Sequence, residues 1–157
     1  MNNIFTDDDY MLWRLFTQAR NATNKLRQRE LLRYGLTPRK AAILLVLLAA
    51  KDDVNSYRIA KWLVLEHHSV SELIDRMEKE GLVNKVRNHD NRRSIRIQLT
   101  DKGVNAAEQA SKAESFHTVM AVLSEKDRRQ FINVLKRLRD NALQELALTN
   151  TLPYPPF

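Results

Sequence analysis

The sequence predicts a mainly α fold with a small antiparallel β-hairpin, and two observations lead to this fold class. Apolar residues recur at the spacing of amphipathic helices along most of the chain, but between residues 82 and 99 the spacing changes to two, which is typical of strands. The 157 residues include only three glycines and four prolines, and three of the prolines lie in the last five residues, so few boundaries interrupt the helices. The length fits a single domain, residues 1–157.

Two helices are expected before residue 51. The first covers residues 7–33, begins at acidic residues and ends before Gly35. Thr37 and Pro38 then supply a cap and a first-turn residue. The segment 37–50 that they open is apolar almost all round, as in a helix buried at the centre of a domain.

Two shorter helices follow. The third is capped by Asn55 or Ser56. The fourth begins near His67 and stops at Gly81, and its apolar face consists of Val70, Leu73, Ile74 and Met77.

The hairpin comes directly after Gly81 and is basic. In its first strand Leu82 and Val86 share one parity, whereas Lys85 and Arg87 share the other. Residues 88–91 are turn-forming. The second strand should direct three apolar side chains to the core: Ile95, Ile97 and Leu99.

Two long helices are expected after the hairpin, over residues 101–123 and 125–148. The second of them opens at the capping box from Ser124 to Asp127. Together with the helix over residues 7–33, they carry more apolar surface than one small module can cover. We therefore expect these helices to pack against a second copy of the chain.

The composition limits the kind of partner. Lys and Arg number 26 against 19 Asp and Glu, and the net charge of +7 favours a polyanion such as nucleic acid or an anionic membrane. The absence of cysteine excludes disulfide scaffolds and Cys-ligated metal sites. The longest apolar run, Ala41–Ala50, is too short to span a bilayer, and the N-terminus lacks the features of a signal peptide, so we expect a cytoplasmic protein without a membrane partner.

Three short helices followed by a hairpin are the order of elements in a winged helix-turn-helix, whose last helix enters the major groove of DNA. The expected DNA-binding lobe covers residues 36–100. Residues 7–33 and 101–157 are the expected dimerisation helices that flank it.

Several segments of the chain resemble the MarR family of transcriptional regulators. A recognition helix, a glycine stop, a D-x-R wing and an L-T-x-K-G exit stand in the family's order, in the segments Leu36–Pro38, Ile59–Ala60, Ser69–Ser71, Ile74–Val83, Asp90–Arg93 and Leu99–Gly103. The resemblance implies a homodimer that binds a pseudo-palindromic operator in double-stranded DNA. It also implies a repressor that a small, commonly aromatic or phenolic, ligand releases.

Residues off the apolar stripe of the fourth helix, together with polar residues of the hairpin, are the expected DNA contacts. Hydroxyl and guanidinium groups suit phosphates and base edges. Glu72 departs from the basic or polar residue common at this position of the family, and it would either accept a hydrogen bond from cytosine or repel phosphate. The expected DNA-binding residues are His68, Ser69, Ser71, Glu72, Arg76, Lys85, Arg87, Asp90, Arg92, Arg93 and Arg96.

At the wing tip, strand alternation distinguishes two neighbouring arginines. Counting outward from Ile95, Arg92 falls on the side that faces away from the core, whereas Arg93 has the opposite parity unless the tip bulges. Asp90 can orient the guanidinium of Arg92, which matches the family's D-x-R pattern. An ion pair within the wing that has no DNA role is the alternative.

A ligand cleft is implied only by the resemblance, at the place where the first, second and fifth helices of the family meet. The residues expected there are Trp13, Arg20, Ile43, Leu47 and Phe116, although aromatic residues at helical spacing are more often part of a core. Neither a metal nor another cofactor is expected, because the histidines lack the spacing of a ligand set. No catalytic residue is expected either, since no phosphate loop, nucleophile elbow or acid–base pair is found.

Two alternatives stay open at this point. The chain can be a constitutive DNA binder without a ligand. It can also be a helical protein-interaction module whose acidic fourth helix does not read DNA. Binding to duplex DNA that depends on salt separates the second alternative from the DNA-binding interpretations.

Overall fold

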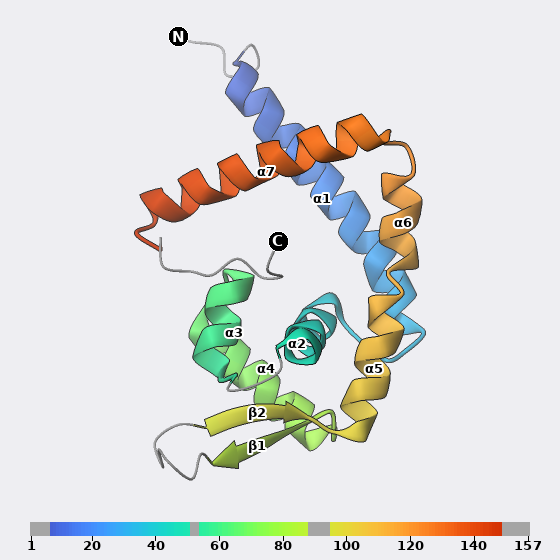
Figure 1. Cartoon of the computed structure of the whole chain (residues 1–157), viewed down its shortest axis with the longest axis vertical. Helices are drawn as coiled ribbons and strands as arrows, with labels where there is room; N and C mark the ends of the chain where they lie inside the picture. The colour runs from blue at the N-terminus through green and yellow to red at the C-terminus, as the bar shows by residue number, and fades with distance from the viewer. Residues whose placement is uncertain (1–6, 51–53, 88–94, 149–157) are drawn as a thin grey trace.

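The computed structural model describes residues 7–50, 54–87 and 95–148 (Figure 1). These residues form α1 (Asp8–Leu32), α2 (Pro38–Ala49), α3 (Ser56–Leu63), α4 (His67–Lys79), β1 (Val83–Arg87), β2 (Ile95–Leu99), α5 (Asp101–Ser111), α6 (Glu114–Met120) and α7 (Glu125–Glu145). The two strands pair antiparallel, which confirms the predicted class of a mainly α winged helix-turn-helix. Among the helices described, none has the length and apolar content needed to cross a membrane.

Side-chain caps set the beginnings of α2 and α3, as the sequence predicts. Thr37 Oγ1 accepts a hydrogen bond from the backbone N of Lys40 at 3.3 Å, and Pro38 occupies the first helical position. Of the two cap candidates for α3, Asn55 is the one used, because its Oδ1 accepts from the backbone N of Arg58 at 2.9 Å.

Glycines and a capping box set three further boundaries. Gly35 and Gly81 take left-handed φ angles of 68° and 73°, which allow the chain to leave α1 and α4. At the start of α7, Ser124 and Asp127 form the predicted capping box, with hydrogen bonds in both directions.

The core of the lobe formed by the described residues between 36 and 100 is built around α2, which is seen end-on at the centre of Figure 1. Its residues Ile43, Leu44 and Val46 are fully buried, which confirms the central helix that the apolar segment predicts. The hairpin closes one side of this core through Val83 and Ile97, and the backbone of Ile97 also donates to Val54 O at 2.8 Å. The hairpin is thereby fixed to the segment that precedes α3.

The helices α1 and α7 extend beyond this lobe, at the end of the molecule opposite the hairpin (Figure 1). In α1 only residues of the last two turns are buried, and no residue of α7 is buried. Large apolar side chains are therefore exposed on both helices: Met11, Leu12, Trp13, Leu15 and Phe16 on α1, and Phe131, Ile132, Val134 and Leu138 on α7.

The prediction of one continuous helix over residues 101–123 is wrong. The helix breaks between α5 and α6 at Ala113, whose φ is 48°. In a continuous helix the carbonyl of Ala110 would accept from the backbone N of Glu114. Here Arg27 Nη2 donates to Ala110 O at 2.5 Å, and the N of Glu114 donates to Glu30 Oε1 at 3.0 Å. Two side chains of α1 thus replace one helical hydrogen bond.

The parity expected for β1 is also wrong. Leu82 is buried, but it belongs to the turn after Gly81, and the strand begins at Val83. Val83 and Lys85 therefore share the face that meets the rest of the lobe, whereas Val86 points outward with 38 % of its surface exposed.

In β2 the predicted inward face is only partly buried. Ile97 is buried and Leu99 packs against the core, as predicted. Ile95 is 45 % exposed because it pairs with Arg87 at the outer end of the hairpin, where the core no longer covers the strand.

Candidate nucleic-acid interface

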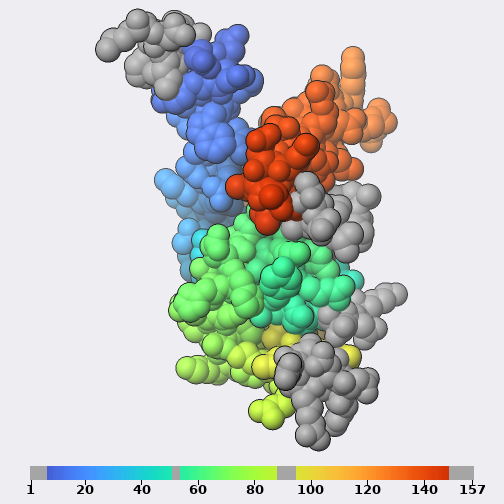
Figure 2. All heavy atoms as spheres, turned by 90° about the vertical axis from the view of Figure 1, so that its left-hand side faces the viewer, coloured from blue at the N-terminus to red at the C-terminus, as the bar shows by residue number. Residues whose placement is uncertain are grey.

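The polar face of α4 lies opposite the side chains that anchor this helix in the core. Val70, Leu73, Ile74 and Met77 are buried. Their spacing turns most of the predicted contact residues outward: His68, Ser69, Glu72 and Arg76 are exposed and Ser71 is half-buried. Figure 2 shows α3 and α4, in green, together on one face of the molecule below the blue of α1 and the red of α7.

The first turn of α4 is held by α3. His67 Nε2 lies 3.0 Å from Ser56 Oγ and 3.4 Å from Ser71 Oγ, and its ring meets the ring of Tyr57 edge-on. His68 instead points outward and pairs with Glu72, at 3.1 Å between Nε2 and Oε1. Sequence reasoning did not find this contact of His67, since its partner Ser56 lies on another helix.

The carboxylates in the second half of α4 are paired with lysines of neighbouring elements. Lys85 on β1 contacts Asp75 and also Glu78, and Lys40 on α2 binds both carboxylate oxygens of Glu80, at 2.7 and 2.6 Å. These partners reduce the negative charge that α4 presents at the surface, so the acidic content of the helix does not by itself oppose DNA binding.

The contact between Lys85 and Asp75 shifts the pKa values of both groups. The hydrogen bond from Lys85, opposed by burial, lowers the pKa of Asp75 below its ordinary value. The same hydrogen bond, again opposed by burial, raises the pKa of Lys85. Both groups are therefore held in their charged forms.

The hairpin presents two of the predicted contacts within the described residues. Arg87 is exposed at the outer end of β1, and Arg96 on β2 is half-buried opposite Val86. The wing-tip residues Asp90, Arg92 and Arg93 lie outside the described residues, so their DNA role stays a prediction.

The five residues expected to bind a ligand are not brought together within one chain. Ile43 and Leu47 are buried in the core around α2. Phe116 lies against Arg27, with the guanidinium carbon 5.0 Å from the ring centre. Trp13 is 64 % exposed, and it precedes Arg27 by about 21 Å along α1 at the helical rise. Arg20 is exposed between them.

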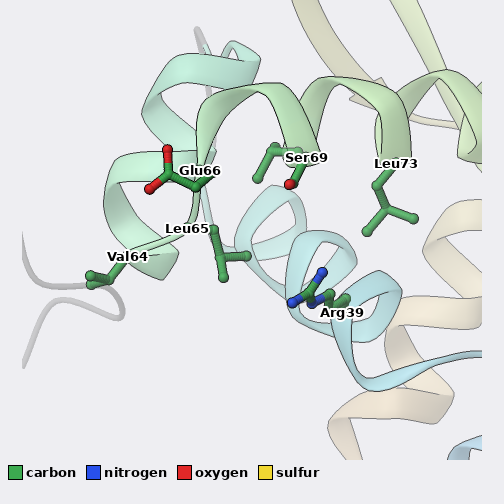
Figure 3. Close-up of a pocket in the computed structure, with 7 residues that line it drawn as sticks. Arg39, Val64, Leu65, Glu66, Ser69 and Leu73 are labelled. Atoms are coloured by element: carbon green, nitrogen blue, oxygen red, sulfur yellow. The ribbon is translucent and has the colours of Figure 1, made fainter.

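A cavity of about 200 Å³ lies elsewhere, between the start of α2 and the first half of α4. Its lining residues are Arg39, Val64, Leu65, Glu66, Ser69, Val70 and Leu73. Leu65, Leu73 and Arg39 converge on this space, whereas Glu66 points away from it (Figure 3). The cavity is therefore separate from the junction of α1, α5 and α6 at which Phe116 lies.

That junction contains a buried ion pair that sequence reasoning missed. Arg27 Nη1 lies 2.9 Å from Glu30 Oε2, and both residues are almost fully buried. Glu30 also accepts hydrogen bonds from the backbone and hydroxyl of Ser115. The available signal was positional: Arg27 stands one helical turn before the buried Leu31, so it shares the inner face of α1.

The side chains that most often bind metal ions are spread over the described residues. Within residues 7–50, 54–87 and 95–148, no three His, Asp or Glu side chains come close enough to hold a metal ion.

Comparisons with known proteins find similarity to one family and to several of its regulators. The model of the MarR family matches residues 36–95. Among curated proteins of Bacillus subtilis, the HTH-type transcriptional regulator MhqR is 26% identical over 141 residues, which are 88% of this chain and 97% of MhqR. The uncharacterized HTH-type transcriptional regulator YdgJ is 28% identical over 100 residues, and this match covers 62% of the chain but only 61% of YdgJ.

Solved structures of the organohalide-sensing regulator RdhR-CbdbA1625 extend the similarity to nearly the whole chain. The ligand-free form has a TM-score of 0.87 at 26% identity, over 99% of this chain and 94% of that one. The form bound to 2,4-dichlorophenol has a TM-score of 0.81 at 29% identity, over 91% and 86% of the two chains.

Proposed function

We propose that this chain is a regulator of the MarR family, and more finely a homodimeric repressor of transcription, which binds a pseudo-palindromic operator and is released by a small aromatic ligand. The family match over residues 36–95 and the similarity to HTH-type transcriptional regulators support the coarser part of this proposal, a DNA-binding transcriptional regulator of the winged helix-turn-helix class. The observation that carries the finer proposal is the uncovered apolar surface of α7.

Dimerisation follows from this surface. α7 has 21 residues and none is buried, while Phe131, Ile132 and Leu138 are exposed. In proteins most of the stability of a helix comes from tertiary packing of its apolar face, and within one chain α7 has little such packing. A second copy of the chain supplies an equal apolar face around a two-fold axis, with residues 7–33 and 101–157 as the dimerisation helices.

Light scattering at micromolar concentration tests the dimer. The wild type and a Lys126→Glu control, which changes an exposed charge in the first turn of α7, should both be dimeric. Leu138→Glu should be monomeric, because it places a charge on the apolar face. A wild-type monomer would contradict the proposal.

Operator binding is proposed from the exposed face of α4 and its position beside the hairpin. A two-fold dimer presents two such faces, so the half-site centres should lie about 10 base pairs apart on one side of the duplex. Selection of bound duplexes from random DNA tests this spacing. Selected sequences without a repeated half-site would argue against a dimer that binds two half-sites.

Ligand control is supported by the relative RdhR-CbdbA1625, which is known in a 2,4-dichlorophenol-bound form. In this chain the exposed ring of Phe116, which packs on the buried guanidinium of Arg27, offers an aromatic surface at the junction of α1 and α6. A panel of chlorinated phenols and aromatic carboxylates should lower operator affinity by stabilising a geometry that does not bind DNA.

A constitutive binder is the second candidate function. The burial of Ile43 and Leu47 favours it, because these two side chains do not open onto a cleft within one chain. Operator affinity and melting temperature that no compound of the panel changes would establish this second function.

A further inference from the structure

Two carboxylates of α4 and one lysine of β1 form an ion cluster between the recognition helix and the wing. Lys85 Nζ binds Asp75 Oδ1 and lies 3.6 Å from Glu78 Oε2. The backbone N of Lys85 also donates to Glu78 Oε1, at 3.0 Å. Because Asp75 and Glu78 stand three residues apart, these contacts attach the middle of β1 to one full turn of α4.

The cluster lies partway along the hairpin, so its geometry affects the position of the outer part of the wing. Val83 is buried at the base of the hairpin, and Ile97, the cross-strand partner of Lys85, is buried at the level of the cluster. Beyond Lys85, the described side chains of Arg87 and Ile95 are exposed at the outer end. A strand rises about 3.3 Å per residue, so Arg87 stands roughly 7 Å further out than Lys85. A change of hairpin angle at Lys85 therefore displaces the outer part of the wing.

Within the cluster, Asp75 and Glu78 already bind the ammonium group of Lys85 to which a DNA phosphate would otherwise bind. Lys85 faces α4 with its side chain 30% exposed, on the same face of the hairpin as the buried Ile97. The two carboxylates outnumber the lysine, so the cluster carries a net negative charge when all three groups are ionised. A phosphate that approached Lys85 would have to displace Asp75 while also meeting the charge of Glu78.

We propose that Lys85 is a positioning residue, which fixes the angle between the wing and the recognition helix by binding Asp75 and Glu78 and does not itself bind a phosphate. The proposal rests on the DNA binding proposed above. It replaces the expectation, drawn from the basic hairpin, that Lys85 is a DNA contact.

The Asp75→Asn variant shows whether the Asp75 carboxylate acts by repelling DNA or by holding Lys85, because the two roles predict opposite changes in DNA affinity. If the carboxylate acts only through its charge near DNA, its removal should strengthen binding. If it holds Lys85 and thereby the wing, its removal should weaken binding to the selected operator by about two- to fivefold, since the partly exposed ion pair between Lys85 and Asp75 is lost. Glu108→Gln is the control, because it makes the same change of net charge on the exposed side of α5.

The experiment measures operator affinity of the full chain by fluorescence anisotropy. Lys85→Met should weaken binding about as much as Asp75→Asn, and Lys85→Arg should restore most of the affinity. The double variant Asp75→Asn/Lys85→Met should bind as Lys85→Met does, because both changes remove one shared interaction. Thermal melting of each variant confirms that it is folded.

A second readout needs no DNA. Glu78→Gln weakens the acceptor of the Lys85 backbone amide, so hydrogen exchange at this amide should become about tenfold faster in the free protein. Exchange unchanged by Glu78→Gln would remove the attachment on which the proposal depends.

The outcomes distinguish this inference from the proposed function. A wild type that binds no duplex would refute the function itself. A wild type that binds its operator, together with an Asp75→Asn variant that binds as tightly as Glu108→Gln or more tightly, would overturn only the positioning role. Additive effects of Asp75→Asn and Lys85→Met would overturn it as well, because independent effects would show that Lys85 acts without Asp75.

Discussion

Replacing Glu30 by Gln should destabilise the folded protein by about 3 kcal/mol at neutral pH, because it removes the charge that balances a buried arginine. Glu30 is only 4 % exposed, and its carboxylate joins α1 to the first residues of α6, while its partner Arg27 binds the carbonyl of Ala110 near the end of α5. The amide of Gln keeps the shape of the side chain, so the loss reports charge and hydrogen bonding and excludes a cavity as its cause.

The magnitude comes from the pKa of Glu30. Burial works to raise this pKa, but hydrogen bonds from Ser115 and Arg27 outweigh it and lower the pKa from 4.5 to about 2. This difference corresponds to about 3 kcal/mol of stability. Because the folded-state pKa is the lower one, the contribution is complete above about pH 4.5. It is lost as the pH falls from 4.5 towards 2.

Urea denaturation at one fixed protein concentration measures the effect, since a dimer's stability depends on concentration. In thermal denaturation at neutral pH, Glu30→Gln should lower the melting temperature by roughly 6 to 12 °C. Between pH 4.5 and 2 the variant should lose about 3 kcal/mol less than the wild type. Glu108→Gln, at an exposed position, serves as the control and should follow the wild type at every pH.

A double variant tests whether the unpaired charge of Arg27 causes the loss of stability in Glu30→Gln. Arg27→Met/Glu30→Gln removes both buried charges and should recover much of the stability that Glu30→Gln loses, because the destabilisation comes from an unpaired cation. A cost below about 1 kcal/mol for Glu30→Gln, or acid sensitivity equal to that of the wild type, would refute the account of this junction.

Four other substitutions have defined outcomes. Val64→Gly should stabilise the protein by about 1 kcal/mol in urea denaturation, because Val64 has a φ of 52° and is half exposed. Gly103→Ala should destabilise it by about 2 kcal/mol or more in the same assay, since the new Cβ would stand 2.0 Å from the backbone oxygen of Leu82. Arg92→Ala at the predicted wing tip should cost roughly 1 to 3 kcal/mol of operator binding, measured by anisotropy, and Arg93→Ala should cost less.

Each of these has its own control or contrary result. Val122→Gly is the control for Val64→Gly, because Val122 is exposed and has no positive φ, and it should not stabilise the chain. If both substitutions stabilise the protein, the effect arises in the unfolded state and not from relief of the left-handed φ. A Gly103→Ala protein that melts like the wild type would mean that α5 can move away from the turn at Leu82. Normal binding by Arg92→Ala with loss in Arg93→Ala would reverse the parity argument at the wing tip.

The sequence predicts the fold class and the family because these depend on local signals. The Thr37 cap, the Gly81 stop and the box of Ser124 and Asp127 act within one helical turn, so each can be read from neighbouring residues. The apolar stripe of α4 similarly determines which of its side chains face outward.

Features that depend on distant residues could not be read in this way. Arg27 and Glu30 break the helix at Ala113 although they lie more than 80 residues earlier in the chain. The faces of β1 were assigned from alternation alone, and Leu82 shifted that assignment because it belongs to the turn. The partners of Lys85 on α4 follow from this shift, so they were missed as well.

The salt dependence of operator binding tests the central claim most directly. If each dimer neutralises about 6 to 10 phosphates, log affinity should fall linearly with log salt, and affinity should drop by roughly 10³ to 10⁵ between 50 and 200 mM. The measurement is made by anisotropy with the wild-type chain on its selected duplex, and a stoichiometry of one dimer per duplex is expected. Affinity for duplex DNA that does not change with salt would contradict the account and favour a protein-interaction module.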